Sequence, residues 1–120
     1  MQLSEGMRVK LNLALALSHK AELLILDEPT SGLDPISREE ILEVFRYLRR
    51  QGIAILFSTH ITTDLEKCAD DITYIAKGGM IASEPLAQFL RRCKDAGKGE
   101  DLESIMIGTE KENLYERIAQ

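Results

Sequence analysis

The sequence predicts an α/β fold in which a mostly parallel sheet is flanked by helices and followed by a C-terminal β-hairpin and further helices. Two uninterrupted apolar runs, at residues 23–26 and 53–57, lack the polar alternation of a half-exposed strand. Such runs are typical of strands buried on both faces of a parallel sheet. Helical patterns precede and separate the two runs. Adjacent glycines at positions 78 and 79 favour a hairpin turn between two later apolar segments.

A first helix is expected from Ser4 to about residue 17 or 18, because a serine hydroxyl is a good N-cap. Residues 11–17 alternate leucine with alanine and asparagine, a pattern that a strand would also show. The segment contains no β-branched residue, however, so helix propensity favours the helix. The first strand is then expected at residues 23–26.

The second helix is expected to begin at Pro35 behind an Asp34 cap, since proline suits the first helical position. Ser37 and Glu40 form an alternative capping box one turn later. Gly52 is expected to end this helix just before the second strand.

The C-terminal half is predicted to contain shorter elements. These are a helix near residues 62–68, a β-hairpin from residues 72–75 and 80–82, a helix from Pro85 to about residue 93, and a polar linker over residues 94–100. Gly108 is expected to divide the remaining tail into two short helices. The predicted domain organisation is therefore a main body at residues 1–93 and a linker with a helical tail at residues 94–120.

Bulk composition argues against several classes of protein. A chain of 120 residues holds one domain at most. Its net charge of −5 and its isoelectric point of about 5.1 argue against a nucleic-acid-binding face. No apolar run approaches the ~20 residues that span a bilayer, so membrane association is expected only through a partner. Cys68 and Cys93 lack metal-ligand spacing, which indicates reduced thiols.

Asp27 and Glu28 directly follow the first apolar run, so they are expected at the carboxyl end of a strand, where open α/β sheets bind ligands. Consecutive residues of an extended chain point to opposite sides, so one carboxylate can hold a metal while the other acts on a water. The alternative is that two acids simply end a strand in solvent. The abrupt change from apolar to acidic residues, with Pro29 after them, favours a functional pair.

Four short motifs, in this order, resemble those of the ATP-binding cassette (ABC) family. Leu-Ser-Glu-Gly-Met at residues 3–7 is similar to the family signature Leu-Ser-Gly-Gly-Gln, and the aliphatic-Asp-Glu segment at 23–28 is similar to the Walker B motif. Residues 31–34 resemble the D-loop, and Ser-Thr-His at 58–60 resembles the switch-histidine segment. Any one motif is weak evidence, whereas the ordered set is specific. The resemblance implies a partial P-loop NTPase-like fold.

The resemblance also implies a role for each residue of an ATP-hydrolysing site. Asp27 would hold Mg²⁺ through a coordinated water, Glu28 would act as general base on the attacking water, and His60 would contact the γ-phosphate. ATP and Mg²⁺ are therefore the expected ligands. For His60 the alternative is an ordinary histidine at the start of a helix, and His19 is interpreted as structural.

Three further residues are implied in a part of the site that two subunits share. Ser4 and Gly6 would form an anion site at a helix N-terminus that faces the γ-phosphate of the opposite subunit, and Asp34 would reach across the dimer. Plain N-caps at Ser4 and Asp34 are the alternative interpretation, and for Asp34 both can hold together. Glu5 and Met7 depart from the signature, a variation that resembles exporter-type bacterial cassettes.

The phosphate-binding Gly-x-x-x-x-Gly-Lys-Ser/Thr loop is absent from these 120 residues, and so is the Gln-bearing loop that the family places before the signature. The chain therefore resembles the C-terminal portion of a cassette, and we expect the longer protein to begin before Met1. A strand edge left unpaired in such a portion would favour dimerisation.

The expected function is that of the ATP-binding subunit of an exporter-type ABC transporter, of which this chain is a fragment. ATP hydrolysis would be coupled to transport through a separate multi-span permease at the cytoplasmic face of the membrane. The other expected partner is a second cassette, and no nucleic acid is expected. Two alternatives stay open: a non-hydrolysing assembly or dimerisation module, or a non-transport ABC ATPase. The fragment alone is expected to be inactive.

Overall fold

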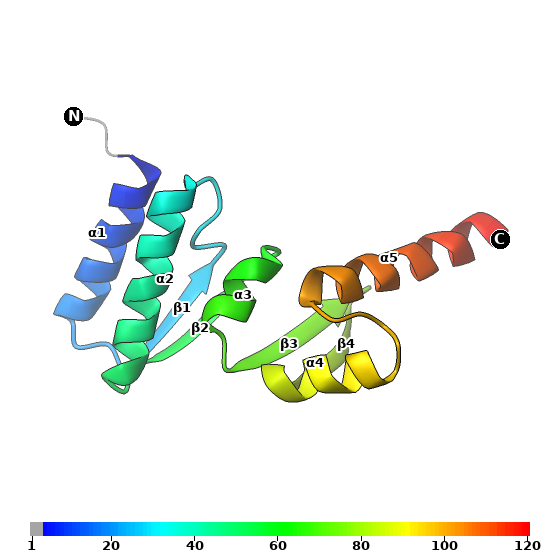
Figure 1. Ribbon diagram of the computed structural model, residues 1–120. Helices are drawn as coiled ribbons and strands as arrows, with labels where there is room; N and C mark the ends of the chain where they lie inside the picture. Colours follow the sequence, from blue (N-terminus) through cyan, green and yellow to red (C-terminus); the bar gives the residue numbers. More distant parts are fainter. Residues whose placement is uncertain (1–3) are drawn as a thin grey trace. The chain divides into compact units, whose positions relative to one another are not determined.

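The computed structural model describes residues 4–120, which form two compact units (Figure 1). The first unit, up to Ile61, contains α1 (Glu5–Ser18), β1 (Leu23–Asp27), α2 (Pro35–Arg50) and β2 (Ala54–Ser58). The second unit, from Thr62, contains α3 (Thr62–Cys68), β3 (Asp71–Ala76), β4 (Gly79–Pro85), α4 (Leu86–Asp95) and α5 (Leu102–Ala119). The predicted α/β fold is confirmed, because helices accompany a parallel strand pair and a hairpin with further helices follows it.

The core of the first unit lies between α2 and one face of the strand pair. β1 and β2 pair in parallel, with Leu24 opposite Ile55 and Leu26 opposite Phe57. Phe57 meets Phe45 of α2, with the ring centroids 5.5 Å apart. α2 buries an apolar stripe that consists of Ile41, Leu42, Phe45 and Leu48. The spacing of this stripe is that of one face of a helix, as the sequence pattern requires.

The other face of the strand pair is open. Leu24 is only 4% exposed, whereas Ile25 and Leu56 are 71% and 62% exposed. The prediction that these strands are buried on both faces is therefore wrong within the described residues. Successive side chains of a strand point to opposite faces, and the helices of this unit supply an apolar layer for only one of them. Half of each apolar run consequently faces outward.

The ends of the two long helices in the first unit agree with the sequence. Ser4 Oγ accepts a hydrogen bond of 3.1 Å from the backbone N–H of Met7 and so caps α1. α2 begins at Pro35, as predicted, and not at the alternative capping box one turn later. Gly52, with φ of +85°, adopts the left-handed conformation that lets the chain leave α2 and enter β2.

The second unit contains the predicted hairpin. β3 and β4 are antiparallel, and the register shifts by a bulge between Tyr74 and Ile75. The turn residues Lys77 and Gly78 both have positive φ, at 52° and 73°. Tight two-residue hairpin turns of the type I′ class require this conformation at both positions, and glycine adopts it without steric cost.

A buried apolar cluster holds the second unit together. Its buried members come from β3, β4, α4 and α5, and they are Ile72, Ala82, Leu86, Phe89, Cys93, Leu102 and Ile105. The last two belong to the segment for which we predicted a separate tail, and the division at residues 93 and 94 stays a prediction about the family's domain boundary.

The prediction that Gly108 divides the C-terminal segment is wrong, because α5 is one continuous helix. Asp101 caps it by accepting a 2.8 Å hydrogen bond from the backbone N–H of Ser104. Burial of Leu102 and Ile105 then stabilises its first turns. A glycine inside a helix costs only about 1 kcal/mol relative to alanine, which this capping and burial exceed.

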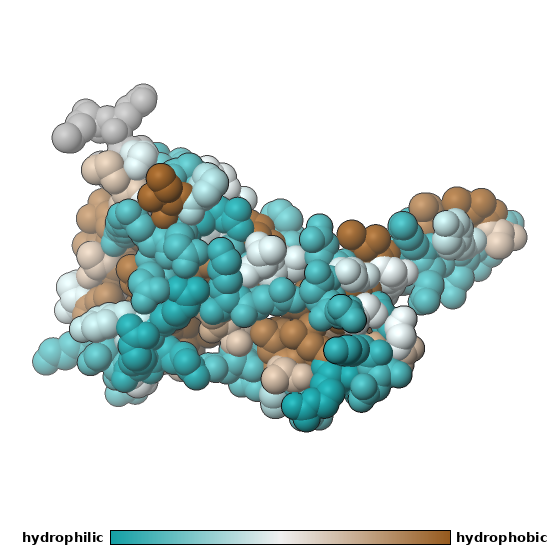
Figure 2. Space-filling view, viewed as in Figure 1, coloured by the Kyte–Doolittle hydropathy of each residue, from teal (hydrophilic) through white to brown (hydrophobic). Residues whose placement is uncertain are grey.

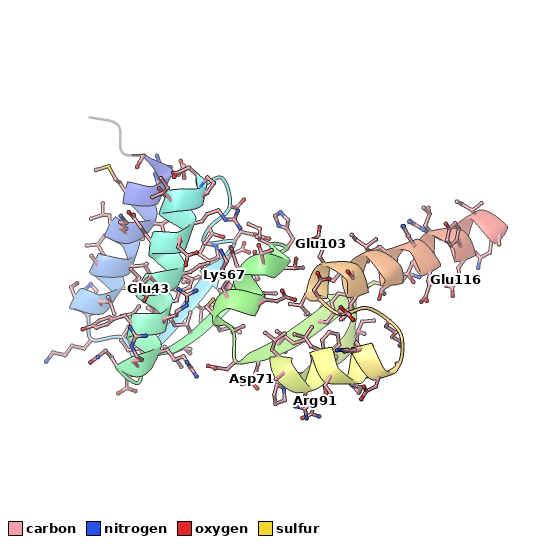
Figure 3. All side chains as sticks on the ribbon, in the orientation of Figure 1. Glu43, Lys67, Asp71, Arg91, Glu103 and Glu116 are labelled. Carbon is pink, nitrogen blue, oxygen red and sulfur yellow. The ribbon has the colours of Figure 1, made fainter. Side chains whose placement is uncertain are left out.

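The outer surfaces of the helices are largely charged. Figure 3 shows Glu43 on α2, Arg91 on α4 and Glu116 on α5 with their side chains directed outward. Apolar surface remains over the end of α5 (Figure 2), where the exposed residues are Leu114, Tyr115 and Ile118. Within residues 4–120, no helix combines the length and the apolar character that crossing a membrane would need.

Candidate functional site

The candidate site lies at the carboxyl edge of the parallel strand pair. Asp27 ends β1 and Ser58 ends β2, and the two residues are partners in the strand register. Because the strands run in the same direction, the residues that follow them emerge at the same edge. Glu28 and His60 are therefore neighbours, although 32 positions separate them in the chain. Ligands of open α/β sheets bind at such an edge.

Glu28 and His60 form a direct pair. Nδ1 of His60 lies 2.8 Å from Oε1 of Glu28, which is hydrogen-bond distance. The backbone N–H of Glu28 also donates to the carbonyl of Ser58 at 2.8 Å, so the strand pairing continues to the acidic residue itself. The structure thus brings the carboxylate and the imidazole into contact, while the catalytic roles predicted for them stay predictions.

The backbone conformation of Glu28 is unusual for a residue with a side chain. Its φ of +46° lies in the left-handed region, which favours glycine. This conformation turns the chain sharply from β1 into Pro29 and Thr30, both of which are buried. Strained residues of this kind, which cost of order 1–3 kcal/mol, are concentrated at functional sites.

The second carboxylate oxygen of Glu28 is a hydrogen-bond acceptor without a donor within residues 4–120. Oε2 is buried and has no hydrogen-bond partner among the described residues. Buried polar atoms without partners are rare in folded proteins, so each one requires an explanation. The Glu28 side chain as a whole is 35% exposed, and the imidazole beside it is 74% exposed. Oε2 itself therefore has no contact with solvent in this structure, although the side chain is partly exposed. A partly exposed carboxylate beside an imidazole is the type of group that can take a proton from a water molecule.

Asp27 makes a different contact. The hydroxyl of Ser58 donates to Oδ1 of Asp27 at 2.6 Å. The sequence assigned no role to Ser58. The two residues are 31 positions apart, so their contact can be recognised only when the register of the two strands is known. The only sequence signal for this contact is that each of the two residues directly follows an aliphatic run.

A cation would need more ligands than the protein offers here. Among residues 4–120, no three side chains of His, Cys, Asp or Glu gather closely enough to hold a metal ion. Mg²⁺ keeps several of its waters and commonly uses one or two carboxylates together with phosphate oxygens. Asp27, exposed and already oriented by a hydroxyl, fits that kind of site. A metal such as Zn²⁺, which takes a full set of protein ligands, does not fit.

The anion site was predicted at the start of α1, and it stays a prediction. Ser4 caps the helix, as its alternative interpretation required. Gly6 is buried, and a Cβ atom placed on it would lie 3.0 Å from Oγ and 3.1 Å from Cβ of Ser37 in α2. Gly6 therefore allows α1 and α2 to approach closely, a packing role that the sequence analysis missed. Leu3, the first residue of the signature-like motif, lies outside the described residues.

Asp34 caps α2. Its Oδ2 accepts hydrogen bonds of 3.1 Å from the backbone N–H groups of Ile36 and Ser37. Hydrogen bonds from the Ser37 hydroxyl and then from the Ser37 backbone hold the pKa of the Asp34 carboxyl below its ordinary value. The capping interpretation of Asp34 is confirmed, and its predicted contact across a dimer stays a prediction.

The neighbouring departures from the signature are exposed. Glu5 lies 3.5 Å from Arg8 in an i, i+3 ion pair, with both side chains more than half exposed. Met7 is likewise exposed. The Glu5 carboxylate is thus engaged along the surface of α1 by a cation, which reduces the negative charge that it presents at the helix start.

Comparison with known proteins gives one family. The family model described as "AAA domain, putative AbiEii toxin, Type IV TA system" matches residues 1–63. Over 118 residues the chain is 37% identical to "Uncharacterized ABC transporter ATP-binding protein sll0415" of Synechocystis sp., which covers 98% of this chain and 32% of that protein.

Two further relatives have more specific names. The chain is 44% identical over 79 residues to "Linearmycin resistance ATP-binding protein LnrL" of Bacillus subtilis, covering 66% of this chain and 25% of that protein. It is 42% identical over 80 residues to "Lantibiotic transport ATP-binding protein SrtF" of Streptococcus pyogenes, covering 67% of this chain and 35% of that protein. The chain thus spans a quarter to about a third of the length of these relatives.

Proposed function

This chain belongs to the ATP-binding cassette family, and the AAA-domain family model matches more than half of its residues. We propose that it carries the hydrolytic residues of the ATP-binding subunit of an ABC transporter. The observation that carries this proposal is the contact between Glu28 and His60 at the carboxyl edge of the parallel strands. A carboxylate at hydrogen-bond distance from a histidine, at the edge where open α/β sheets bind ligands, supports a role in activating water.

Glu28 is the proposed general base. Its Oε1 contacts His60, and its Oε2 is buried without a partner among the described residues, so the side chain must turn before either oxygen accepts the proton of an attacking water. A carboxylate can only accept hydrogen bonds, so the imidazole donates through Nδ1 when Glu28 is ionised. Nε2 of His60 then carries a hydrogen only in the imidazolium form, and in that form it donates to the γ-phosphate of ATP. His60 thereby orients the base and binds the substrate at once.

Asp27 is the proposed carboxylate for Mg²⁺, which when bound neutralises charge on the phosphates and polarises them toward attack. The residue holds the cation through a coordinated water, in keeping with the lack of a full protein ligand set among the described residues. Ser4 and Gly6 at the start of α1 are proposed to face ATP that a second cassette binds, and Asp34 to contact that second cassette.

The proposed partners are a second cassette and a multi-span membrane permease at the cytoplasmic face, and the proposed direction of transport is export. The names of two relatives, which include lantibiotic transport and linearmycin resistance, support a transport role. The resemblance of the Glu-Gly-Met variant of the signature to exporter cassettes supports the direction. Co-purification of the full protein with a membrane protein encoded by a neighbouring gene tests the assembly.

An assembly module that does not hydrolyse ATP is the second candidate function for these residues by themselves. The 120 residues contain no Gly-x-x-x-x-Gly-Lys-Ser/Thr sequence to cradle phosphates with backbone N–H groups. We expect calorimetric titration of the 120-residue chain with ATP to give no micromolar binding. Micromolar affinity would contradict this expectation and show that the described residues form a nucleotide site alone.

The test of the proposed base is Glu28→Gln in a complete cassette that contains this sequence. The amide keeps the size of the carboxylate and loses its basicity, so turnover is expected to fall by about 10²–10⁴-fold while ATP binding persists. Glu116→Gln, on the outer surface of α5 (Figure 3), is the matched control and leaves turnover unchanged. Unaltered turnover in Glu28→Gln would refute the assignment of the base.

A further inference from the structure

The end of β2 carries a residue with no assigned role that contacts the proposed cation ligand. We propose that Ser58 is a positioning residue, which orients the Asp27 carboxylate so that its free oxygen faces the hydration shell of a divalent cation. This inference rests on the proposed function, because it assumes that Asp27 serves a cation. The juxtaposition that supports it is a single hydrogen bond of 2.6 Å between the last residues of two paired strands.

The strand register explains why the two side chains meet. Asp27 and Ser58 are direct partners in the parallel ladder, and residues paired in this way have side chains on the same face. Both residues lie on the open face of the pair, in the same alternating set as the exposed Ile25 and Leu56. The hydrogen bond is therefore made at a solvent-accessible edge, where a hydrated ion can approach.

The chemistry of the contact favours orientation over stability. An exposed hydrogen bond that replaces one to water contributes little to folding. A bond to a charged carboxylate is short and directional, however, and it removes the free rotation of the Asp27 head group. With Oδ1 engaged by the Ser58 hydroxyl, only Oδ2 retains its full acceptor capacity. Residues that hold metal ligands in this way commonly tune affinity for the ion.

The backbone around Ser58 is held independently of its hydroxyl. The Ser58 carbonyl accepts from the N–H of Glu28 at 2.8 Å, and the ladder pairs the preceding residues of both strands. Removing the hydroxyl alone therefore leaves the strand pair and the Glu28 turn in place. The side-chain contact can be tested without disturbing the element that positions the general base.

The experiment measures cation binding, without turnover, in a complete cassette that contains this sequence and the Glu28→Gln change. Mn²⁺ in the presence of ATP is titrated by electron paramagnetic resonance. Adding Ser58→Ala is expected to weaken Mn²⁺ affinity about tenfold, the lower end of the effect of removing residues that support metal ligands. Ser58→Thr keeps a hydroxyl on a residue that suits strands, and affinity is expected to stay within about twofold.

A matched serine in the second unit serves as the control. Ser83 lies 2.9 Å from the Thr73 hydroxyl, an exposed side-chain hydrogen bond between paired residues of β3 and β4. Ser83→Ala removes the same kind of cross-strand contact in a separate strand pair that does not include Asp27, so Mn²⁺ affinity is expected to be unchanged. Denaturation of the 120-residue Ser58→Ala chain checks that the fold persists.

The possible results separate this inference from the proposed function. Equal Mn²⁺ affinity in Ser58→Ala and in its Glu28→Gln parent overturns the positioning role and leaves the proposed function intact. Equal loss in Ser58→Ala and Ser58→Thr overturns it as well, because the hydroxyl would then not be the group that matters. A Glu28→Gln parent that binds no Mn²⁺ with ATP overturns the proposed function, and this inference with it.

Discussion

The two units of the molecule bury their apolar residues in different ways. In the second unit, the hairpin and the helices α4 and α5 enclose a continuous cluster around Phe89. In the first unit, α2 covers one face of the β1–β2 pair, while residues such as Ile25 and Leu56 stay exposed on the other. The second unit also exposes apolar side chains, since Ile75 and Met80 of its hairpin are 65% and 69% exposed. The two units therefore differ in which elements cover their cores, a parallel pair under one helix or a hairpin under two.

The carboxylates of the two units differ in a related way. In the second unit they serve the backbone and the packing: Glu66 accepts from the N–H of Leu102 at 2.8 Å, and Asp101 caps α5. In the first unit, Asp27 contacts a hydroxyl and Glu28 contacts an imidazole. The first unit also has a carboxylate of the capping kind, Asp34, so the difference lies in the pair at the open strand edge, whose partners are side chains and not backbone N–H groups.

The largest effect is expected from Leu→Ala substitutions, three of which test whether the core of the first unit is covered on one side only. Leu24→Ala and Leu102→Ala remove buried side chains, one from each unit, and each is expected to lower the free energy of unfolding by about 2–5 kcal/mol. Leu56→Ala removes an exposed side chain and is expected to cost less than about 1 kcal/mol. Urea denaturation measures all three. A Leu56→Ala loss equal to that of Leu24→Ala would mean that the open face is covered in solution.

A smaller change in stability is expected from Gly→Ala substitutions at two helical glycines, one in each unit. Gly6→Ala places a Cβ 3.0 Å from Ser37 Oγ, and such overpacking costs typically about 1–3 kcal/mol, offset by up to about 1 kcal/mol of helix propensity. Gly108→Ala meets nothing closer than the Lys98 carbonyl oxygen at 4.0 Å, so it is expected to stabilise by up to about 1 kcal/mol. Denaturation midpoints of the two variants should move in opposite directions.

The overpacking interpretation has its own internal check. Ser37→Gly removes both atoms that crowd the new Cβ, so it should restore part of the stability that Gly6→Ala loses. A double-mutant cycle should then show that the double variant is more stable than the sum of the two single effects predicts. Additive effects would indicate that the contact between α1 and α2 is looser than the described distance.

The smallest effect concerns acid stability, where the two units behave alike. The pKa of Asp34 and that of Asp101 are both lowered, chiefly by hydrogen bonds from Ser37 and Ser104, respectively. A depressed folded-state pKa stabilises the fold above the ordinary value of 3.8, and this contribution is lost as the pH falls through the folded-state pKa.

Asparagine variants test this acid dependence. Asn is a good N-cap that does not titrate, so Asp34→Asn and Asp101→Asn should each flatten the decline of stability below pH 3.8 while leaving the helices intact. Circular dichroism during acid titration measures the decline. If stability falls with pH in the same way in both variants and in the parent, other carboxylates determine the acid dependence.

Much of the local structure could be predicted because its causes are local. The caps at Ser4 and Asp34, the start of α2 at Pro35 and the turn at Gly78 depend on hydrogen bonds and backbone angles within a few residues. The failure at Gly108 is also instructive. Its local propensity argued for a break, and the cap at Asp101 with the burial that follows it proved stronger.

The candidate site could be predicted only in part. Asp27 and Glu28 were predicted from their position after an aliphatic run, and His60 from the resemblance to the family. The structure shows a contact between Glu28 and His60, which the sequence did not specify. Ser58 was missed because its partner depends on the strand register. The catalytic, cation-binding and cross-dimer roles themselves stay predictions until the variants are measured.

The sequence by itself determined the order of helices and strands, the helix starts and the presence of an acidic pair at a strand end, since these follow from periodicity and short-range hydrogen bonding. Only the tertiary structure decided which residues meet across the chain: Glu28 with His60, Asp27 with Ser58, and Gly6 with Ser37. It also decided that one face of the strand pair stays open. Periodicity specifies that a side chain is apolar and which face it shares, but whether another layer covers that face depends on what packs against it.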